Sequence, residues 1–252
     1  MQNVLTKISG EAKFELLIFL ALALIPLIFS GYILFILPQY MLFGLLAVSL
    51  SILWGLTGII SFGQAGFFAI GAYAIGIVVK STFLMNSATL GILLGIIVSA
   101  VIAGVVGYFL FSAKVKATYF VLATLALSII NEQLEKSQKE ITGGWNGLFV
   151  DRISISFGNL LEYSLFNDIP MYYFTLLLTI IAYALIKFLT TSNFGKILRG
   201  IRENEDRILA LGYDTSIYKT LIFCVSGALA GFAGSIYCLL YTSDAADDTP
   251  CV

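Results

Sequence analysis

The chain has 252 residues, of which 59% are hydrophobic and 12% are charged, with 14 basic side chains, 15 acidic side chains and no histidine. Soluble domains carry about twice that charged fraction, and the mean hydropathy here is +0.97. From Leu16 to Val79 there is no Asp, Glu, Lys or Arg, which leaves room for about three membrane helices of about 20 residues each. The composition therefore excludes a soluble protein and predicts an all-α, polytopic helical bundle in a membrane.

About seven apolar spans are expected along the chain. Because Lys7 and Lys13 precede the first run and no small-residue cleavage site follows it, we interpret that run as a retained helix rather than a signal peptide. Pro38 is expected to separate the first two helices. Pro26 is expected to kink the first, as membrane helices tolerate. The predicted helices cover residues 16–36, 40–58, 61–79, 89–113, 117–131, 171–190 and 216–240.

The stretch GLTGIISFGQAGFFAIGAYAIG, from Gly55 to Gly76, is apolar, yet its glycines follow no single helical face. Glycine costs a helix about 1 kcal/mol per residue, and polar side chains add to the irregularity. Such backbone survives at membrane depth where protein buries it or where it lines a wet cavity. We therefore predict a broken or re-entrant span beside a solute path, with close packing alone as the alternative. The candidate path residues are Trp54, Ser61, Gly63, Gln64, Gly66 and Tyr73, together with Trp145 and Asn146 of the next outward loop.

Small residues recur every four positions in two of the expected helices. One row comprises Gly91, Gly95, Ser99, Ala103 and Gly107, and the other comprises Gly227, Gly231 and Ser235. Rows of this kind let a second helix approach closely, although glycine is common in membrane helices in general. They are consistent with a tightly packed transporter core.

The pair Trp145 and Asn146 follows two glycines and meets the substrate or a binding protein, or else anchors the loop at the membrane interface.

The polar segment TSNFGKILRGIRENEDRILALGYD ends at Asp214 and predicts an amphipathic helix. Its apolar face comprises Ile197, Leu198, Ile201, Ile208 and Leu209. Ser192 or Asn193 is expected to cap the start of this helix, and Gly212 to end it. Arg202 with Asp206, and Glu203 with Arg207, have the i,i+4 spacing of helical ion pairs. The mixed charge favours docking on a partner protein over binding a lipid surface.

The placement of Lys and Arg predicts a cytoplasmic N-terminus, since only Lys80, Lys136, Lys139 and Arg152 then fall outside. Gly195 and Lys196 are not part of a phosphate-binding loop, because Ile197 follows them and position 190 is not glycine. Any ATP would therefore be used by another chain. A channel, a secondary transporter and an intramembrane enzyme are disfavoured, since we find no filter, no carboxylate inside an apolar run and no histidine.

Three blocks of sequence carry a resemblance to a known family, and together they lie within about Leu42 to Tyr237. They read GLTGIISFGQAGFFAIGAY, TGGWNGL and FGKILRGIRENEDRILALGYDTSIYKTLIFCVSGALAGFAGSIY. The chain resembles the permease subunits of high-affinity branched-chain amino-acid ABC importers, a family that also includes urea and short-chain amide importers. The resemblance implies alternating access in an inner-membrane complex. It further implies a second permease subunit, two cytoplasmic ATPases that use ATP, and a periplasmic binding protein.

The resemblance also implies a set of residues that couple the ATPases to transport, within a segment at about 190–214. These are Phe194, Gly195, Lys196, Arg199, Arg202, Glu203 and Glu205. No catalytic residue, metal, bound cofactor or nucleic acid is expected, and membrane lipid surrounds the chain. The sequence favours branched-chain amino acids as substrate and leaves urea or a short amide open.

The last residues do not continue the family pattern. The resemblance predicts a permease domain over residues 1–237. Residues 238–252, CLLYTSDAADDTPCV, resemble a translated sequencing adapter. We interpret them as an artefactual tail, so that the natural C-terminus is expected to be longer than the chain given.

Overall fold

The computed structural model describes residues 15, 17–26, 32–80, 88–138, 142–144, 155–156, 162–163 and 168–244. A short helical segment, Leu17–Pro26, precedes the main helices. The elements are α2 (Tyr32–Thr57), α3 (Gln64–Lys80), α4 (Ala88–Ser112), α5 (Ala117–Ser137), β1 (Ile155–Ser156), β2 (Glu162–Tyr163), α7 (Asp168–Thr191), α8 (Asn193–Glu203), α9 (Glu205–Ala210) and α10 (Thr215–Asp244). The two strands form one short antiparallel pair, with Ile155 opposite Tyr163.

Five of these helices, α2, α4, α5, α7 and α10, are long and apolar enough to cross a membrane. Leu17–Pro26 and α3 are apolar but shorter. The predicted all-α membrane bundle is therefore confirmed, whereas a count of seven full-length spans is not confirmed. At 17 residues, α3 is about 25 Å long at 1.5 Å per residue, which is less than the hydrocarbon thickness of about 30 Å.

Two predicted helix boundaries are wrong. Pro38 lies inside α2, which already begins at Tyr32. A membrane helix tolerates the missing backbone donor of a proline when neighbouring helices satisfy the freed carbonyl group. The predicted break at Pro38 therefore does not occur. The helix predicted over 117–131 runs on to Ser137, so that Glu132 and Glu135 are part of α5.

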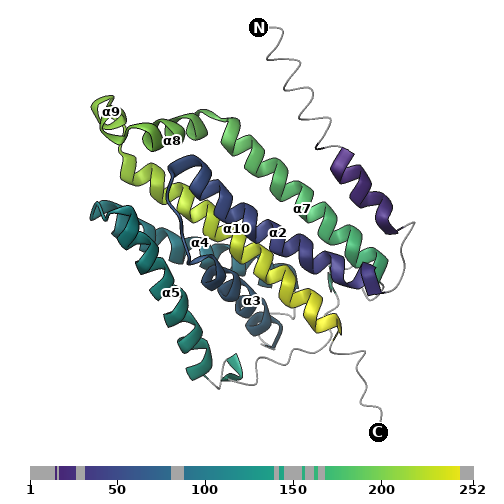
Figure 1. Ribbon diagram of the computed structural model, residues 1–252. Helices are drawn as coiled ribbons and strands as arrows, with labels where there is room; N and C mark the ends of the chain where they lie inside the picture. The colour runs from purple at the N-terminus through teal and green to yellow at the C-terminus, as the bar shows by residue number, and fades with distance from the viewer. Residues whose placement is uncertain are drawn as a thin grey trace.

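The amphipathic segment lies at one end of the bundle. In Figure 1, α8 and α9 lie together beyond the ends of α7 and α10. Lys187, near the end of α7, forms an ion pair with Glu15, so the start of the described chain lies at this same end. The basic residues at this end are Lys114, Lys116, Lys187, Lys196, Arg199, Arg202, Arg207 and Lys219, while Lys80 and Lys136 lie at the opposite end.

Backbones of α3, α4 and α10 approach closely where glycines face one another. A Cβ atom on Gly71 would lie 2.0 Å from the carbonyl oxygen of Gly231, and one on Gly234 would lie 1.9 Å from that of Phe68. On the other side of α10, a Cβ on Gly231 would lie 2.2 Å from Ser99 Oγ. The predicted small-residue rows therefore form the contact surfaces of this three-helix core, as expected for membrane helices.

Phenylalanine rings join α5 to this core. Phe120 of α5 stacks on Phe111 of α4 with ring centroids 4.8 Å apart, and its centroid lies 5.4 Å from that of Phe223 on α10. Phe223 in turn meets Phe67 of α3 edge to face at 5.5 Å. The cluster is one of the contacts that hold α5, which otherwise exposes most of its surface and lies at the edge of the bundle (Figure 1).

We predict that Gly71→Ala lowers the stability of the purified protein in detergent. The added methyl group has no space against Gly231, and overpacking of this kind costs about 1–3 kcal/mol. Gly44→Ala, in α2, is the matched control, because a Cβ there meets nothing within 4 Å. Thermal unfolding monitored by circular dichroism should show a lower midpoint for Gly71→Ala alone. Equal midpoints for the two variants would contradict the close-packing interpretation.

Candidate functional site

The glycine-rich span breaks where α2 ends. Gly58 adopts the left-handed conformation, with φ of 74°, and its amide donates to the carbonyl of Trp54 over 2.9 Å. The Thr57 hydroxyl donates to the carbonyl of Leu53 and accepts from the amide of Ile59 at 3.3 Å. The next helix begins only at Gln64. The predicted break therefore exists and covers residues 58–63, which we call the unwound segment.

A row of polar side chains on α5 holds the unwound segment. Thr124 Oγ1 accepts a hydrogen bond from the amide of Phe62 at 3.2 Å, and Ser128 Oγ donates to the carbonyl of Phe62 at 3.0 Å. One turn further, Asn131 Nδ2 donates to the carbonyl of Gly66 at 3.3 Å. Sequence reasoning missed this row, although its i, i+4, i+7 spacing inside an apolar run is a visible signal of a polar helical face.

The side chain of Gln64 is held in a second polar network, between α2, α3 and α10. Its Nε2 atom donates to Ser226 Oγ at 2.7 Å, and Ser226 Oγ donates to the carbonyl of Ser49 at 2.5 Å. Ser49 Oγ donates back to Gln64 Oε1 at 3.3 Å. Ser61 is 1% exposed and accepts from the amide of Gly63. Satisfied buried polar networks rigidify the surrounding packing, so this one fixes the start of α3.

The structure gathers part of the predicted path set around the break. A Cβ added to Gly63 would lie 3.4 Å from Thr124, and one added to Gly66 would lie 3.2 Å from Ser128 Oγ. Tyr73 is partly buried on α3, whereas Trp54 is 57% exposed near the end of α2. Trp145 and Asn146 lie outside the described residues. The side chains of Ser61 and Gln64 are buried and hydrogen-bonded to the protein itself.

The amphipathic segment folds as two helices rather than the one predicted. Ser192 caps α8 as expected, accepting from the amide of Gly195 at 3.4 Å. Asn204 then leaves the helical conformation, with φ of −157°, and its side chain caps α9. Because Asn204 breaks the helix, the predicted i,i+4 pairs of Arg202 and Glu203 straddle two helices. Gly212, with φ of 88°, follows α9 in the turn that was expected to end the segment.

The apolar face of α8 packs on the membrane helices. Leu198 and Ile201 are buried, and Ile197 and Ile208 are partly buried against the same core. Leu209, also predicted for this face, is instead 41% exposed. A Cβ on Gly195 would lie 2.5 Å from the carbonyl oxygen of Thr190, so this glycine allows α8 to turn tightly away from α7.

The candidate coupling residues divide into two groups by what they touch. Some contact this chain: Phe194 stacks on Tyr218, Arg199 donates to the carbonyl oxygens of Thr190 and Gly195, Arg202 Nη1 donates to the carbonyl of Gly55 at 2.8 Å, and Glu205 pairs with Lys219. Lys196 and Glu203 are exposed, and Lys196 Nζ reaches only Asn193 of its own helix. The first group therefore ties α8 and α9 to the bundle through its contacts, although Arg199 and Arg202 are themselves exposed.

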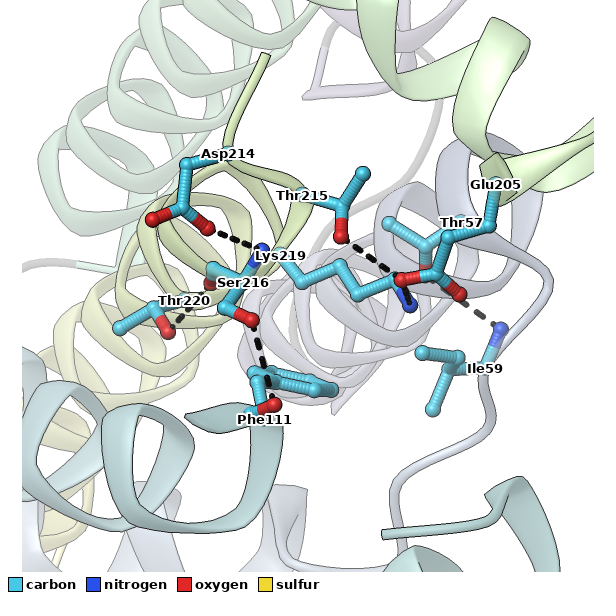
Figure 2. A network of polar contacts seen from close by, with 9 residues as sticks. All are labelled: Thr57, Ile59, Phe111, Glu205, Asp214, Thr215, Ser216, Lys219 and Thr220. Carbon is cyan, nitrogen blue, oxygen red and sulfur yellow. Dashed lines mark hydrogen bonds and ion pairs between the residues drawn. The ribbon is translucent and has the colours of Figure 1, made fainter. Parts of the chain in front are cut away.

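Glu205 is a well-defined ion-pair partner at the junction of α9 and α10. Its Oε1 atom accepts from Lys219 Nζ at 2.6 Å and from Thr215 Oγ1 at 2.8 Å (Figure 2). Burial favours the neutral acid, but the hydrogen bonds from Lys219 and Thr215 outweigh it, so the pKa of Glu205 lies below its usual value. The pair is therefore charged at neutral pH. The contribution of this ion pair to the stability of the fold is present above the ordinary carboxyl pKa, and it is lost as the pH falls through the lowered pKa of Glu205.

An open groove of about 500 Å³ lies between α2 and α7 at the same end of the bundle. It is separate from the buried Gln64 network, because none of the residues of that network line it. The groove is lined by Glu15, Ser51, Ile52, Gly55, Leu56, Tyr183, Ile186, Lys187, Thr190, Thr191 and Arg199.

An apolar helical bundle with an unwound segment among its spans, and an amphipathic helix pair across one end, defines a multi-pass membrane protein. Residues 32–250 match the family described as the permease component of the branched-chain amino acid transport system, and the chain belongs to this family. It is a family of transport permeases rather than of enzymes. The comparison with solved structures gave no match.

Three curated relatives carry the same description in their names. The chain is 27% identical to the high-affinity branched-chain amino acid transport system permease protein LivM of Salmonella typhimurium, over 93% of this chain and 60% of the relative. Identity to LivM of Escherichia coli is 28%, over 78% and 50%. Identity to the probable branched-chain amino acid transport permease protein LivM of Methanocaldococcus jannaschii is 25%, over 81% and 66%. The chain thus spans between half and two thirds of these relatives.

We predict that Thr124→Val loosens the unwound segment. The change keeps the side-chain shape but removes the acceptor of the Phe62 amide, and the loss of such a hydrogen bond costs about 0.5–1.5 kcal/mol. Thr179→Val is the control, because the Thr179 hydroxyl bonds only to a carbonyl of its own helix, at Thr175. Hydrogen–deuterium exchange should become faster across residues 58–66 for Thr124→Val. Unchanged exchange across these residues would contradict the conclusion that α5 holds the unwound segment.

Proposed function

We propose that this chain is a permease subunit of an ATP-driven ABC importer that moves branched-chain amino acids into the cytoplasm. One observation carries the proposal: an amphipathic helix pair packs on the end of the same span that breaks at Gly58, through the contact of Arg202 with Gly55. The proposed docking surface on α8 and α9 is thus in contact with the end of α2, where the unwound segment begins. Alternating access through loop and helix movements is the process that such an arrangement serves.

The proposed partners follow from the family and from what the described helices offer. A second permease subunit would complete the membrane part, and two cytoplasmic ATPases would bind at α8 and α9 and hydrolyse the ATP. A periplasmic binding protein would deliver substrate at the opposite end. Placing α8 and α9 in the cytoplasm obeys the preference of Lys and Arg for that side, and it puts Glu15, the first described residue, on the same side.

The substrate path is proposed to pass at the unwound segment, between α5 and the core of α3, α4 and α10. Opening it requires α5 to separate from residues 58–66, because Thr124, Ser128 and Asn131 now close that side. Gly63 and Gly66 keep this contact close. Branched-chain amino acids are the substrates named in the descriptions of the relatives, so they are the class proposed here, and urea is the competing outcome of the test.

The function is tested by reconstituting the chain in proteoliposomes with its proposed partner subunits. Leucine, isoleucine and valine should accumulate when ATP and binding protein are supplied together, and uptake should stop when ATP is omitted. Urea and a short amide are supplied in parallel. Accumulation of urea alone would replace the proposed substrate class. Solute movement at the same rate without any ATPase subunit would contradict the importer itself.

In the same assay, we expect Gly66→Leu to reduce uptake by roughly tenfold or more, because leucine has no space against Ser128 and α5 would be displaced from the unwound segment. Gly44→Leu is the control, since a Cβ at Gly44 meets nothing within 4 Å. Membrane insertion is checked for both variants by the amount of folded protein recovered in detergent. Normal uptake by a folded Gly66→Leu protein would exclude this segment from the path.

A further inference from the structure

The guanidinium of Arg202 caps the end of α2 at the point where the span breaks. Its Nη1 atom donates to the Gly55 carbonyl at 2.8 Å, and its stem lies over Gly58, where a Cβ would approach Arg202 Cγ to 3.3 Å. The last carbonyls of a helix lack intrahelical partners, and they attract cations. Arg202 therefore belongs to α8 in sequence but stabilises the end of α2.

Glu205 makes the corresponding contact on the other side of Asn204, with α10. Its carboxylate accepts from Lys219 Nζ at 2.6 Å and from Thr215 Oγ1 at 2.8 Å, and the Lys219 side chain is only 13% exposed (Figure 2). Because the Glu205 side chain is 43% exposed, the ion pair is only partly shielded from screening by salt. Glu205 thus ties the start of α9 to the first turns of α10.

The two contacts lead to opposite ends of the unwound segment. Arg202 holds its beginning, at Gly55 and Gly58. Glu205 holds α10 at Lys219. Two turns further along α10, Ser226 Oγ accepts a hydrogen bond from the side-chain Nε2 atom of Gln64, where α3 begins. Close-packed helices shift as rigid bodies rather than deforming continuously, so a displacement of α8 and α9 is passed to both ends of the segment.

We propose that Arg202 and Glu205 are positioning residues, which pass movement of α8 and α9 to the two ends of the unwound segment, and that docking of the ATPase falls to the exposed residues Lys196 and Glu203. The inference rests on the proposed function, since it presumes an ATPase partner. It separates two tasks that a single coupling helix would otherwise share among all its charges. The separation follows from the contacts, because Arg202 and Glu205 bind other helices of this chain, whereas Lys196 and Glu203 are exposed and Lys196 bonds to its own helix at Asn193.

The test uses the full complex in proteoliposomes and three measurements: recovery of the ATPase with the permease, ATP hydrolysis and substrate uptake. Arg202→Ala should leave recovery and hydrolysis within about twofold of the wild type and lower uptake roughly tenfold or more, within the range of measured couplings between sites. Arg202→Lys, which keeps a donor for the Gly55 carbonyl, should restore part of the uptake. The double change Lys196→Glu with Glu203→Lys should instead lower recovery of the ATPase.

A charge exchange tests the second contact. Glu205→Lys and Lys219→Glu should each reduce uptake, and the two together should restore it, because the ion pair is rebuilt with its charges reversed. The reversal Asp206→Lys, at the next residue of α9, controls for charge alone, because the Asp206 side chain is exposed. A merely structural loss would lower the amount of folded complex, which size-exclusion chromatography measures for every variant.

Each outcome decides between the two proposals. Loss of ATPase recovery in Arg202→Ala or Glu205→Lys would show that these residues dock, and the further inference would be wrong while the importer stood. Normal uptake in both, or no rescue by the exchanged pair, would overturn it as well. A wild-type chain that recovers no ATPase at all would overturn the proposed function instead. If Arg202→Ala yields no folded complex, Arg202→Lys decides instead. Lysine keeps a donor for the Gly55 carbonyl, so a folded Arg202→Lys complex without uptake would contradict the positioning role.

Discussion

Unwound backbone inside a membrane protein needs hydrogen-bond partners, and the rest of this structure depends on how residues 58–63 obtain them. Water is absent from the bilayer core, so each unsatisfied peptide group there costs several kcal/mol. The partners come from Thr124 and Ser128 on α5 and from side chains of the segment's own ends, such as Thr57 and Ser61. Among the described residues, no buried side-chain nitrogen or oxygen lacks a partner. The contacts with α5 therefore contribute to the stability of the break.

The close packing of α3, α4 and α10 gives the break a rigid wall on its other side. Where Gly71 meets Gly231 and Gly234 meets Phe68, the backbones touch, and no side chain can yield to a small movement. By contrast, α5 is held by the polar row and the Phe111–Phe120 stack and exposes most of its apolar surface. A rigid wall facing a polar, less packed one is an arrangement that separates most easily at the polar contact. This asymmetry is the physical basis for placing the proposed path between them.

The sequence predicted those features that composition and periodicity determine. The apolar runs indicated the helices, the four-residue rows of small side chains indicated the core, and the clustered glycines indicated the break. Pro38 misled because proline's local effect is overridden when surrounding helices satisfy the backbone. Asn204 was missed as a cap because its neighbours continue the helical spacing. The contact of Arg202 with Gly55 spans 147 positions, and no local pattern reports a pairing at that distance. The roles of Gln64, Gly66 and Trp145 in a path stay predictions.

The division of the amphipathic segment at Asn204 has a mechanical consequence. A single straight helix would carry Arg202 and Glu205 as one rigid body, so the ends of α2 and α10 would have to move together. Asn204 separates the two helices with an extended backbone, so that Arg202 contacts the end of α2 from α8 while Glu205 contacts α10 from α9. Hinges are commonly a few element-terminal residues of this kind. In the proposed mechanism, one docking event on the segment would displace the two ends of the unwound segment by different amounts.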